Sequence, residues 1–117
     1  MVGYLTTHVL DTALGRPAEG LEVKLFKIEG DKNRHLKTLV TNKDGRTGEK
    51  ILPEEVFEIG LYELIFYAGH YFNKSNFPLE TPRFLDIIPI RFGMSEPLHY
   101  HVPLLLSPFG YSTYRGS

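Results

Sequence analysis

The sequence predicts an all-β protein, a two-sheet β-sandwich of about eight short strands with one short helix. Apolar and polar residues alternate along several segments, as they do in strands that bury one face. Turn residues such as Asp44-Gly45 separate these segments at the spacing expected of a sandwich. The length of 117 residues suits a single domain over residues 1–117.

The first half of the chain supplies four predicted strands. Residues 4–12 alternate and place Leu5, Thr7 and Val9 on one face. Residues 13–20 have the composition of a turn, and residues 21–28 then alternate again. A third strand over residues 35–41 ends at the turn sequence "NKDGRTG", where Gly45 tolerates a positive φ. We expect a short fourth strand near residues 49–52.

The second half supplies four more strands and the helix. Residues 61–68 are mostly apolar and aromatic, which favours a buried strand. Residues 70–78 can form one or two helical turns before a proline. Residues 83–92 form a further predicted strand. The last two strands, residues 97–106 and 110–116, are joined by a turn that contains proline and glycine.

Composition excludes several classes of protein. The net charge of −1 gives no reason to expect nucleic acid or an anionic membrane as partner. The absence of cysteine excludes disulfides, thiolate nucleophiles and Cys-type zinc sites. No apolar run has the length of a membrane span, and the first residues do not resemble a signal peptide. We therefore expect a cytoplasmic protein.

Polar side chains gather on faces of strands that do not belong to the core. In the segment "LHYHVPLLL", His99 and His101 lie opposite the core face, and His8 does so in the first strand. Isolated exposed histidines are common and usually have no function. Leu10 and Leu105 lie beside these histidines, however, so the face is expected to be partly buried at an interface between subunits.

A metal site is a second interpretation of the same histidines. His99 and His101 point the same way from a strand, and His8 could supply a third zinc ligand. Nothing in the sequence supplies a fourth ligand, and the pair alone is a weak signal. Arg46, which follows the "NKDG" turn, could by itself be a solvated turn residue.

Three segments resemble one family. The motifs "HVLDTALGRPA", "NKDGR" and "HYHVPLLLSPFGYSTYRGS" are similar to those of the transthyretin-related proteins, the 5-hydroxyisourate hydrolases, and keep their order and spacing. The closing "YRGS" is the most specific part, because transthyretin itself lacks it. Transthyretin also has lysine, glutamate and threonine where this chain has His8, Arg46 and His101.

The resemblance implies a fold, an assembly and an activity. It implies a transthyretin-like sandwich that forms a homotetramer, a dimer of dimers whose active sites lie at a central channel. The implied reaction hydrolyses 5-hydroxyisourate, a purine-derived small molecule, to 2-oxo-4-hydroxy-4-carboxy-5-ureidoimidazoline during urate degradation. It implies no cofactor, no metal and no nucleic-acid or membrane partner. The implied catalytic residues are His8, Arg46, His101 and Tyr114, and substrate binding would involve His8, Arg46, Tyr114, Ser117 and His99.

The chemistry of these side chains is consistent with amide hydrolysis. A neutral imidazole can act as a base near pH 7, and either His101 or His8 could take that role. Arg46 stays protonated, offers a planar fork to an oxygen-rich anion and would lower the pKa of a neighbouring histidine. Tyr114 and Ser117 would position the substrate. We expect the Tyr114 face of the last strand to point into the channel beside His101.

Three alternatives remain at this point. The protein could be a tetrameric carrier that holds a small aromatic ligand in the channel. It could instead be a metal-binding tetramer that uses His8, His99 and His101. It could also be a sandwich whose outer face serves only as an oligomer interface. The fold does not separate these functions, so the site residues must.

Overall fold

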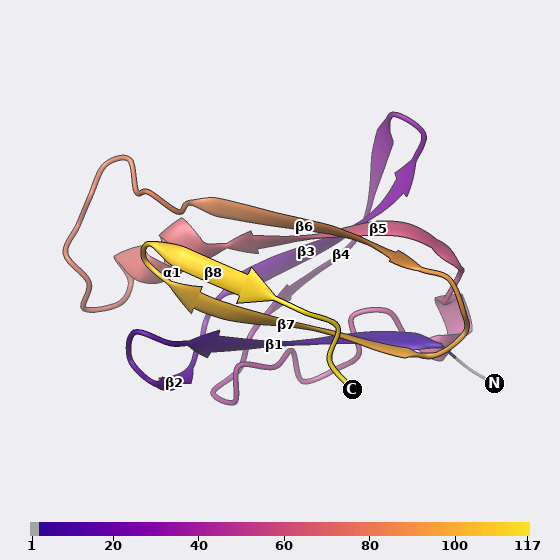
Figure 1. Ribbon diagram of the computed structural model, residues 1–117, viewed down its shortest axis with the longest axis horizontal. Helices are drawn as coiled ribbons and strands as arrows, with labels where there is room; N and C mark the ends of the chain where they lie inside the picture. Colours follow the sequence, from indigo (N-terminus) through magenta and orange to yellow (C-terminus); the bar gives the residue numbers. More distant parts are fainter. Residues whose placement is uncertain (1–2) are drawn as a thin grey trace.

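The computed structural model describes residues 3–117 and consists of two four-stranded β-sheets (Figure 1). This confirms the predicted all-β sandwich with one short α-helix. In chain order the elements are β1 (Tyr4–Asp11), β2 (Arg16–Pro17), β3 (Glu22–Glu29), β4 (Lys32–Val40), the 3₁₀ turn η1 (Glu54–Val56), β5 (Gly60–Tyr67), α1 (Ala68–Asn73), β6 (Ile87–Met94), β7 (His99–Ser107) and β8 (Gly110–Thr113).

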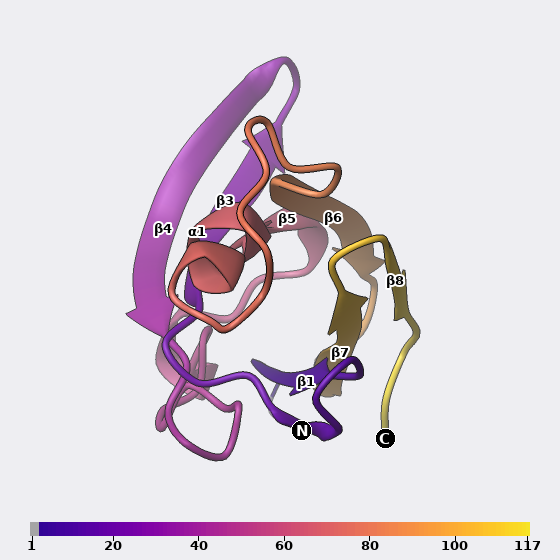
Figure 2. The same cartoon turned by 90° about the vertical axis from the view of Figure 1, so that its left-hand side faces the viewer.

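The two sheets face one another with the core between them (Figure 2). One sheet has the strand order β2-β1-β7-β8 and the other β4-β3-β5-β6. β1 and β7 pair in parallel, whereas the remaining pairs are antiparallel. Because β1 and β7 come from opposite ends of the chain, their pairing joins the two segments that carry His8, His99 and His101.

Side chains alternate between the core and the outer face along β1. Leu5, Thr7 and Val9 are buried, as their spacing predicts, and the Thr7 hydroxyl donates to the carbonyl oxygen of Val102 at 2.6 Å. In β7 the core face carries Tyr100 and other buried side chains. Both β1 and β7 therefore turn one set of side chains into the core and the opposite set toward the outer surface of their sheet.

The predicted strand near residues 49–52 is wrong. Ile51 and Leu52 are buried, but Leu52 makes only an isolated bridge to Leu5. The N–H of Leu5 donates to the carbonyl oxygen of Leu52 at 2.9 Å, and the N–H of Ile51 donates to Leu5 at 2.9 Å. The segment thus meets β1 at one point and then bends away, so no ladder forms.

Other boundaries also differ from the prediction. Residues 13–20 are not only a turn, because β2 pairs with the end of β1 through Leu10 and Asp11. The helix begins at Ala68, earlier than predicted, and β8 ends at Thr113 instead of continuing to residue 116. Among residues 3–117, no helix is long and apolar enough to cross a membrane.

Candidate active site

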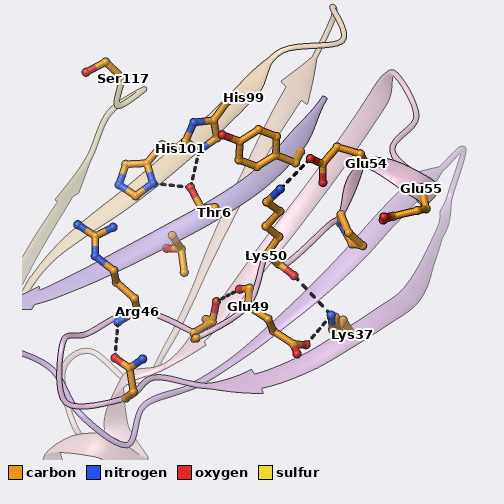
Figure 3. Close-up of a pocket in the computed structure, with 16 residues that line it drawn as sticks. Thr6, Lys37, Arg46, Glu49, Lys50, Glu54, Glu55, His99, His101 and Ser117 are labelled. Carbon is orange, nitrogen blue, oxygen red and sulfur yellow. Dashed lines mark hydrogen bonds and ion pairs between the residues drawn. The ribbon is translucent and has the colours of Figure 1, made fainter. Parts of the chain in front are cut away.

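A pocket of about 890 Å³ lies between the outer face of β1 and β7 and the segment that follows β4. Figure 3 shows the side chains that line it, and they come from segments far apart in the sequence. Four of the predicted site residues are among them, together with a threonine of β1 that the sequence did not indicate. The polar and charged side chains that line the pocket include Thr6, Arg46, Lys50, His99, His101 and Ser117.

The parallel register of β1 and β7 places the two histidines of the H-Y-H segment. Tyr4 lies opposite His99, and Thr6 lies opposite His101. The hydroxyl oxygen of Thr6 is 2.7 Å from Nε2 of His99 and 2.8 Å from Nδ1 of His101. One hydroxyl therefore connects the two imidazoles. The alternation of side chains along β1 could place Thr6 on the outer face, but only the register of β1 against β7 shows that Thr6 lies between His99 and His101.

A tight turn after β4 places Arg46. The N–H of Asn42 donates to the carbonyl oxygen of Arg46 at 2.7 Å, and the N–H of Gly45 donates to Asn42 at 2.9 Å. The carbonyl oxygen of Gly45 accepts the N–H of Val9 at 2.9 Å, which fixes the turn to β1. Gly45 has φ +74°, a conformation that glycine adopts without strain. The turn thus brings the arginine into the pocket.

A close approach to His8 also requires glycine in this turn. A Cβ added at Gly45 would overlap the carbonyl oxygen of Val9 and lie 3.2 Å from Cδ2 of His8. His8 is half-buried beside the turn and is not among the side chains that line the pocket. The chain therefore brings His8 next to the "NKDGR" segment, at the margin of the pocket.

Electrostatics favours the neutral form of two histidines. Burial lowers the pKa of His101 below its ordinary value, and the charge of Arg46 lowers it further. Burial and Arg46 also lower the pKa of His8, although a hydrogen bond and the charge from Asp44 oppose this shift. Both imidazoles are thus favoured in the unprotonated form, which is the form that can accept a proton.

The cationic side chains of the pocket differ in their partners. Lys37 pairs with Glu49 at 2.6 Å, and Lys50 pairs with Glu54 at 2.7 Å. Within residues 3–117, Arg46 has no ion-pair partner. Figure 3 shows its guanidinium pointing toward His101. Arg46 is thus the pocket cation with its charge available to an anionic ligand.

The segment "YRGS" follows β8 and returns to β7. The N–H of Gly116 donates to the carbonyl oxygen of His101 at 2.8 Å, and Ser117 lines the pocket. The guanidinium of Arg115 lies 4.5 Å from the ring centre of Tyr100. Tyr114 is 60% exposed and does not line the pocket. The structure therefore brings Ser117 to the histidines and leaves Tyr114 on the surface.

The part of the chain from residue 3 onward contains no group of three or more His, Cys, Asp or Glu side chains arranged to hold a metal ion. The ring centres of His99 and His101, two possible metal ligands in the pocket, are 6.1 Å apart. Their facing nitrogens are occupied by the Thr6 hydroxyl.

The fold and the site together define a transthyretin-like β-sandwich with a polar pocket of histidine, threonine and arginine on one sheet. Amide hydrolysis is within the chemistry of such a group. A family model described as "HIUase/Transthyretin family" matches residues 5–116, and the chain belongs to this family.

A curated relative has nearly the same length as this chain. The 5-hydroxyisourate hydrolase of Mesorhizobium japonicum is 56% identical over 115 residues, which cover 98% of this chain and 93% of the relative. The match therefore includes the strands that carry the pocket.

Solved structures agree with this relationship. A structure of 5-hydroxyisourate hydrolase from Klebsiella pneumoniae has a TM-score of 0.81 and 35% identity, and covers 97% of this chain and 99% of that one. The structure of an (S)-allantoin synthase has a TM-score of 0.91 and 44% identity, but the match spans 98% of this chain and only 44% of that protein. Sea bream transthyretin in complex with thyroxine has a TM-score of 0.80 and 27% identity, and covers 96% of this chain and 93% of that one.

Proposed function

We propose that this protein hydrolyses 5-hydroxyisourate to 2-oxo-4-hydroxy-4-carboxy-5-ureidoimidazoline, a step of urate degradation. The protein is a hydrolase, since near-full-length relatives that are about half identical to it carry the name 5-hydroxyisourate hydrolase. The observation that carries the proposal is that Arg46, which forms no ion pair with residues 3–117, lies in a pocket with His99 and His101. A carrier of an apolar ligand does not need this arrangement.

The substrate is an oxygen-rich purine derivative, and the pocket offers groups that suit it. The guanidinium of Arg46 presents donors in a planar fork, which matches carbonyl and enolate oxygens. His101 and Ser117 both line the pocket. Arg46 would hold the substrate and stabilise the negative charge that develops on its carbonyl oxygen during attack.

His101 is the proposed general base. Its lowered pKa keeps the imidazole neutral, and its Nδ1 faces Thr6, so Nε2 is the nitrogen left for water. Water attacks the carbonyl carbon of the cyclic amide while its proton passes to His101. The C–N bond then breaks, and the proton is returned to the leaving nitrogen. The net change adds OH to carbon and H to nitrogen, and it uses no metal or cofactor.

His8, His99, Tyr114 and Ser117 complete the proposed site. His8 shares the influence of Arg46 with His101 and could orient the water or donate a proton. His99 lies beside His101 on the same face. Tyr114 and Ser117 would position the substrate. Tyr114 would need to reach the pocket from the surface, or to serve a site that a neighbouring subunit completes.

A homotetramer and a cytoplasmic location also belong to the proposal. The outer face that carries the pocket includes Leu10 and Leu105, which lie opposite one another and are only half-buried in the single chain. Two dimers that pack these faces together would bury both leucines and convert the open pocket into a channel. Light scattering coupled to size-exclusion chromatography tests the tetramer.

A direct assay tests the activity. A uricase generates 5-hydroxyisourate from urate, and its ultraviolet absorbance is followed with and without the protein. We expect the protein to accelerate the loss of the absorbance well above the spontaneous rate. Decay at the spontaneous rate would reject the hydrolase and leave the carrier, which ligand titration would then examine.

A further inference from the structure

The hydroxyl of Thr6 contacts two imidazoles at hydrogen-bonding distance. Its oxygen is 2.7 Å from Nε2 of His99 and 2.8 Å from Nδ1 of His101. Figure 3 shows both contacts converging on Thr6 from β7. Since a threonine hydroxyl has one proton to donate, it donates to one imidazole and accepts from the other. The tautomer of one histidine therefore determines the tautomer of the other.

Two arrangements of protons satisfy these contacts. In the first, Nδ1–H of His101 donates to Thr6, and Thr6 donates to Nε2 of His99. In the second, Nε2–H of His99 donates to Thr6, and Thr6 donates to Nδ1 of His101. The first leaves Nε2 of His101 with a lone pair, and the second leaves it with a proton. Only the first arrangement makes neutral His101 a base toward the pocket.

The charges that face His101 favour the first arrangement. The guanidinium of Arg46 points toward the ring and carries only donors, so it favours a neighbouring lone pair over a neighbouring N–H. The other titratable groups that influence His101 are His99 and His8. Neither supplies a negative charge that would favour a proton on Nε2.

Stacking holds His99 in position to accept the proton of Thr6. The ring of Tyr4 lies parallel to the His99 ring, with centroids 4.1 Å apart and planes 9° apart. Nζ of Lys50 lies 4.2 Å from the centre of the Tyr4 ring, and Lys50 also forms an ion pair with Glu54. His99 is therefore oriented by contacts that do not depend on substrate.

We propose that Thr6 is a positioning residue that holds His101 in the Nδ1–H tautomer, by a hydrogen-bonded chain that runs from His101 through Thr6 to His99. This inference rests on the proposed hydrolase function for its catalytic consequence, but the tautomers exist without substrate. In this chain of contacts, His99 acts as the acceptor that orients Thr6, and Thr6 orients the base.

Nuclear magnetic resonance of protein labelled with ¹⁵N-histidine tests the tautomers directly. In the wild-type protein at a pH where both rings are neutral, we expect Nδ1–H on His101 and Nδ1–H on His99. Thr6→Ser keeps the hydroxyl and should give the same pattern. Thr6→Val keeps the β-branched shape without the hydroxyl, and should shift His101 toward Nε2–H. Wild-type His101 in the Nε2–H form, or an unchanged pattern in Thr6→Val, would overturn the proposal.

Kinetics with 5-hydroxyisourate tests the consequence for catalysis. We expect Thr6→Val to lower kcat about 10²-fold, since a base in the wrong tautomer cannot accept the proton. KM should stay within about twofold, and Thr6→Ser should restore kcat. Equal kcat values for Thr6→Val and wild-type protein would overturn the proposal even if the tautomer changes. If wild-type protein shows the expected tautomers but no hydrolysis, the proposed function fails and the tautomer assignment stands.

Discussion

The backbone of Gly116 lies directly against the imidazole of His101. The N–H of Gly116 donates to the carbonyl oxygen of His101 at 2.8 Å, and a Cβ added at Gly116 would lie 2.6 Å from Cδ2 of the ring. Only a residue without a side chain fits there. The glycine of "YRGS" therefore sets the position of the proposed base.

Gly116→Ala should reduce activity more than stability. The added methyl group must displace the His101 ring, which disturbs its contact with Thr6 while leaving the core unchanged. We expect kcat to fall at least about tenfold, because small displacements of a catalytic group are costly. Gly110→Ala is the matched control, since its Cβ would meet only Oγ of Ser107 at 3.8 Å. Similar kinetics for the two variants would contradict this role for Gly116.

His101→Ala should abolish most of the hydrolysis. Loss of a positioned base costs about 10²–10⁴-fold in rate, so kcat should fall within that range. The elution volume and the melting temperature should match those of the wild-type protein. His70→Ala is a suitable control because His70 is an exposed histidine of α1 outside the pocket. Near wild-type activity of His101→Ala would remove His101 from the mechanism.

Arg46 should set the acid limb of the pH profile. Burial and Arg46 place the pKa of His101 below its ordinary value of 6.5, so its neutral form persists to lower pH. Activity should therefore fall as pH drops through this lowered pKa. Arg46→Gln removes one of these causes and should move the acid limb to higher pH, whereas Arg46→Lys keeps the charge and should not.

Two measurements check this shift. The first is the dependence of kcat/KM on pH, and the second is the titration of His101 by proton chemical shift in the same variants. The titration needs no substrate, so it remains informative if Arg46→Gln is too slow to assay. A shift of the acid limb to lower pH in Arg46→Gln would contradict the proposed effect of Arg46 on the pKa of His101.

Gly45→Ala should destabilise the protein more than an alanine at another glycine of positive φ. Both Gly45 and Gly30 lie in the left-handed region, where a Cβ costs about 1–2 kcal/mol. Gly30 has open space around it, whereas a Cβ at Gly45 would overlap Val9. Overlap in a packed region adds about 1–3 kcal/mol. Urea unfolding of Gly45→Ala and Gly30→Ala measures the difference, and equal losses would show that the overlap is relieved.

Tyr114→Phe tests the tyrosine of "YRGS". If its hydroxyl positions the substrate, its removal should raise KM by up to about tenfold, the value of one hydrogen bond. Tyr111→Phe provides the comparison, because Tyr111 is a second exposed tyrosine of the same terminal segment. Equal KM values for Tyr114→Phe and Tyr111→Phe would mean that Tyr114 has no part in binding.

Much of the fold was predictable because burial follows the alternation of side chains. Along β1 the spacing of Leu5, Thr7 and Val9 gave the core face, and the structure buries all three. The error at residues 49–52 has a physical reason. Ile51 and Leu52 are apolar because they cover the core, and apolar composition alone cannot distinguish a ladder from a single bridge.

The site was less predictable than the fold. His99 and His101 could be placed on one face by their spacing, and the structure puts both in the pocket. Thr6 could not be identified, because alternation gives the face of a residue and not its neighbour on the next strand. Arg46 had no assigned direction either, since the conformation of the turn and its bond to Val9 determine where it points.

The parallel pairing of β1 with β7 also has a consequence for folding. Thr6 and His99 are 93 residues apart in the chain, so their contact closes a very long loop. The entropy of closing it amounts to about 4 kcal/mol from the length-dependent part alone. On the ribosome, β1 emerges long before β7, so the edge of β1 that pairs with β7 in the folded protein has no partner at first. Until β7 is made, the nascent chain holds an exposed strand edge that chaperones could recognise.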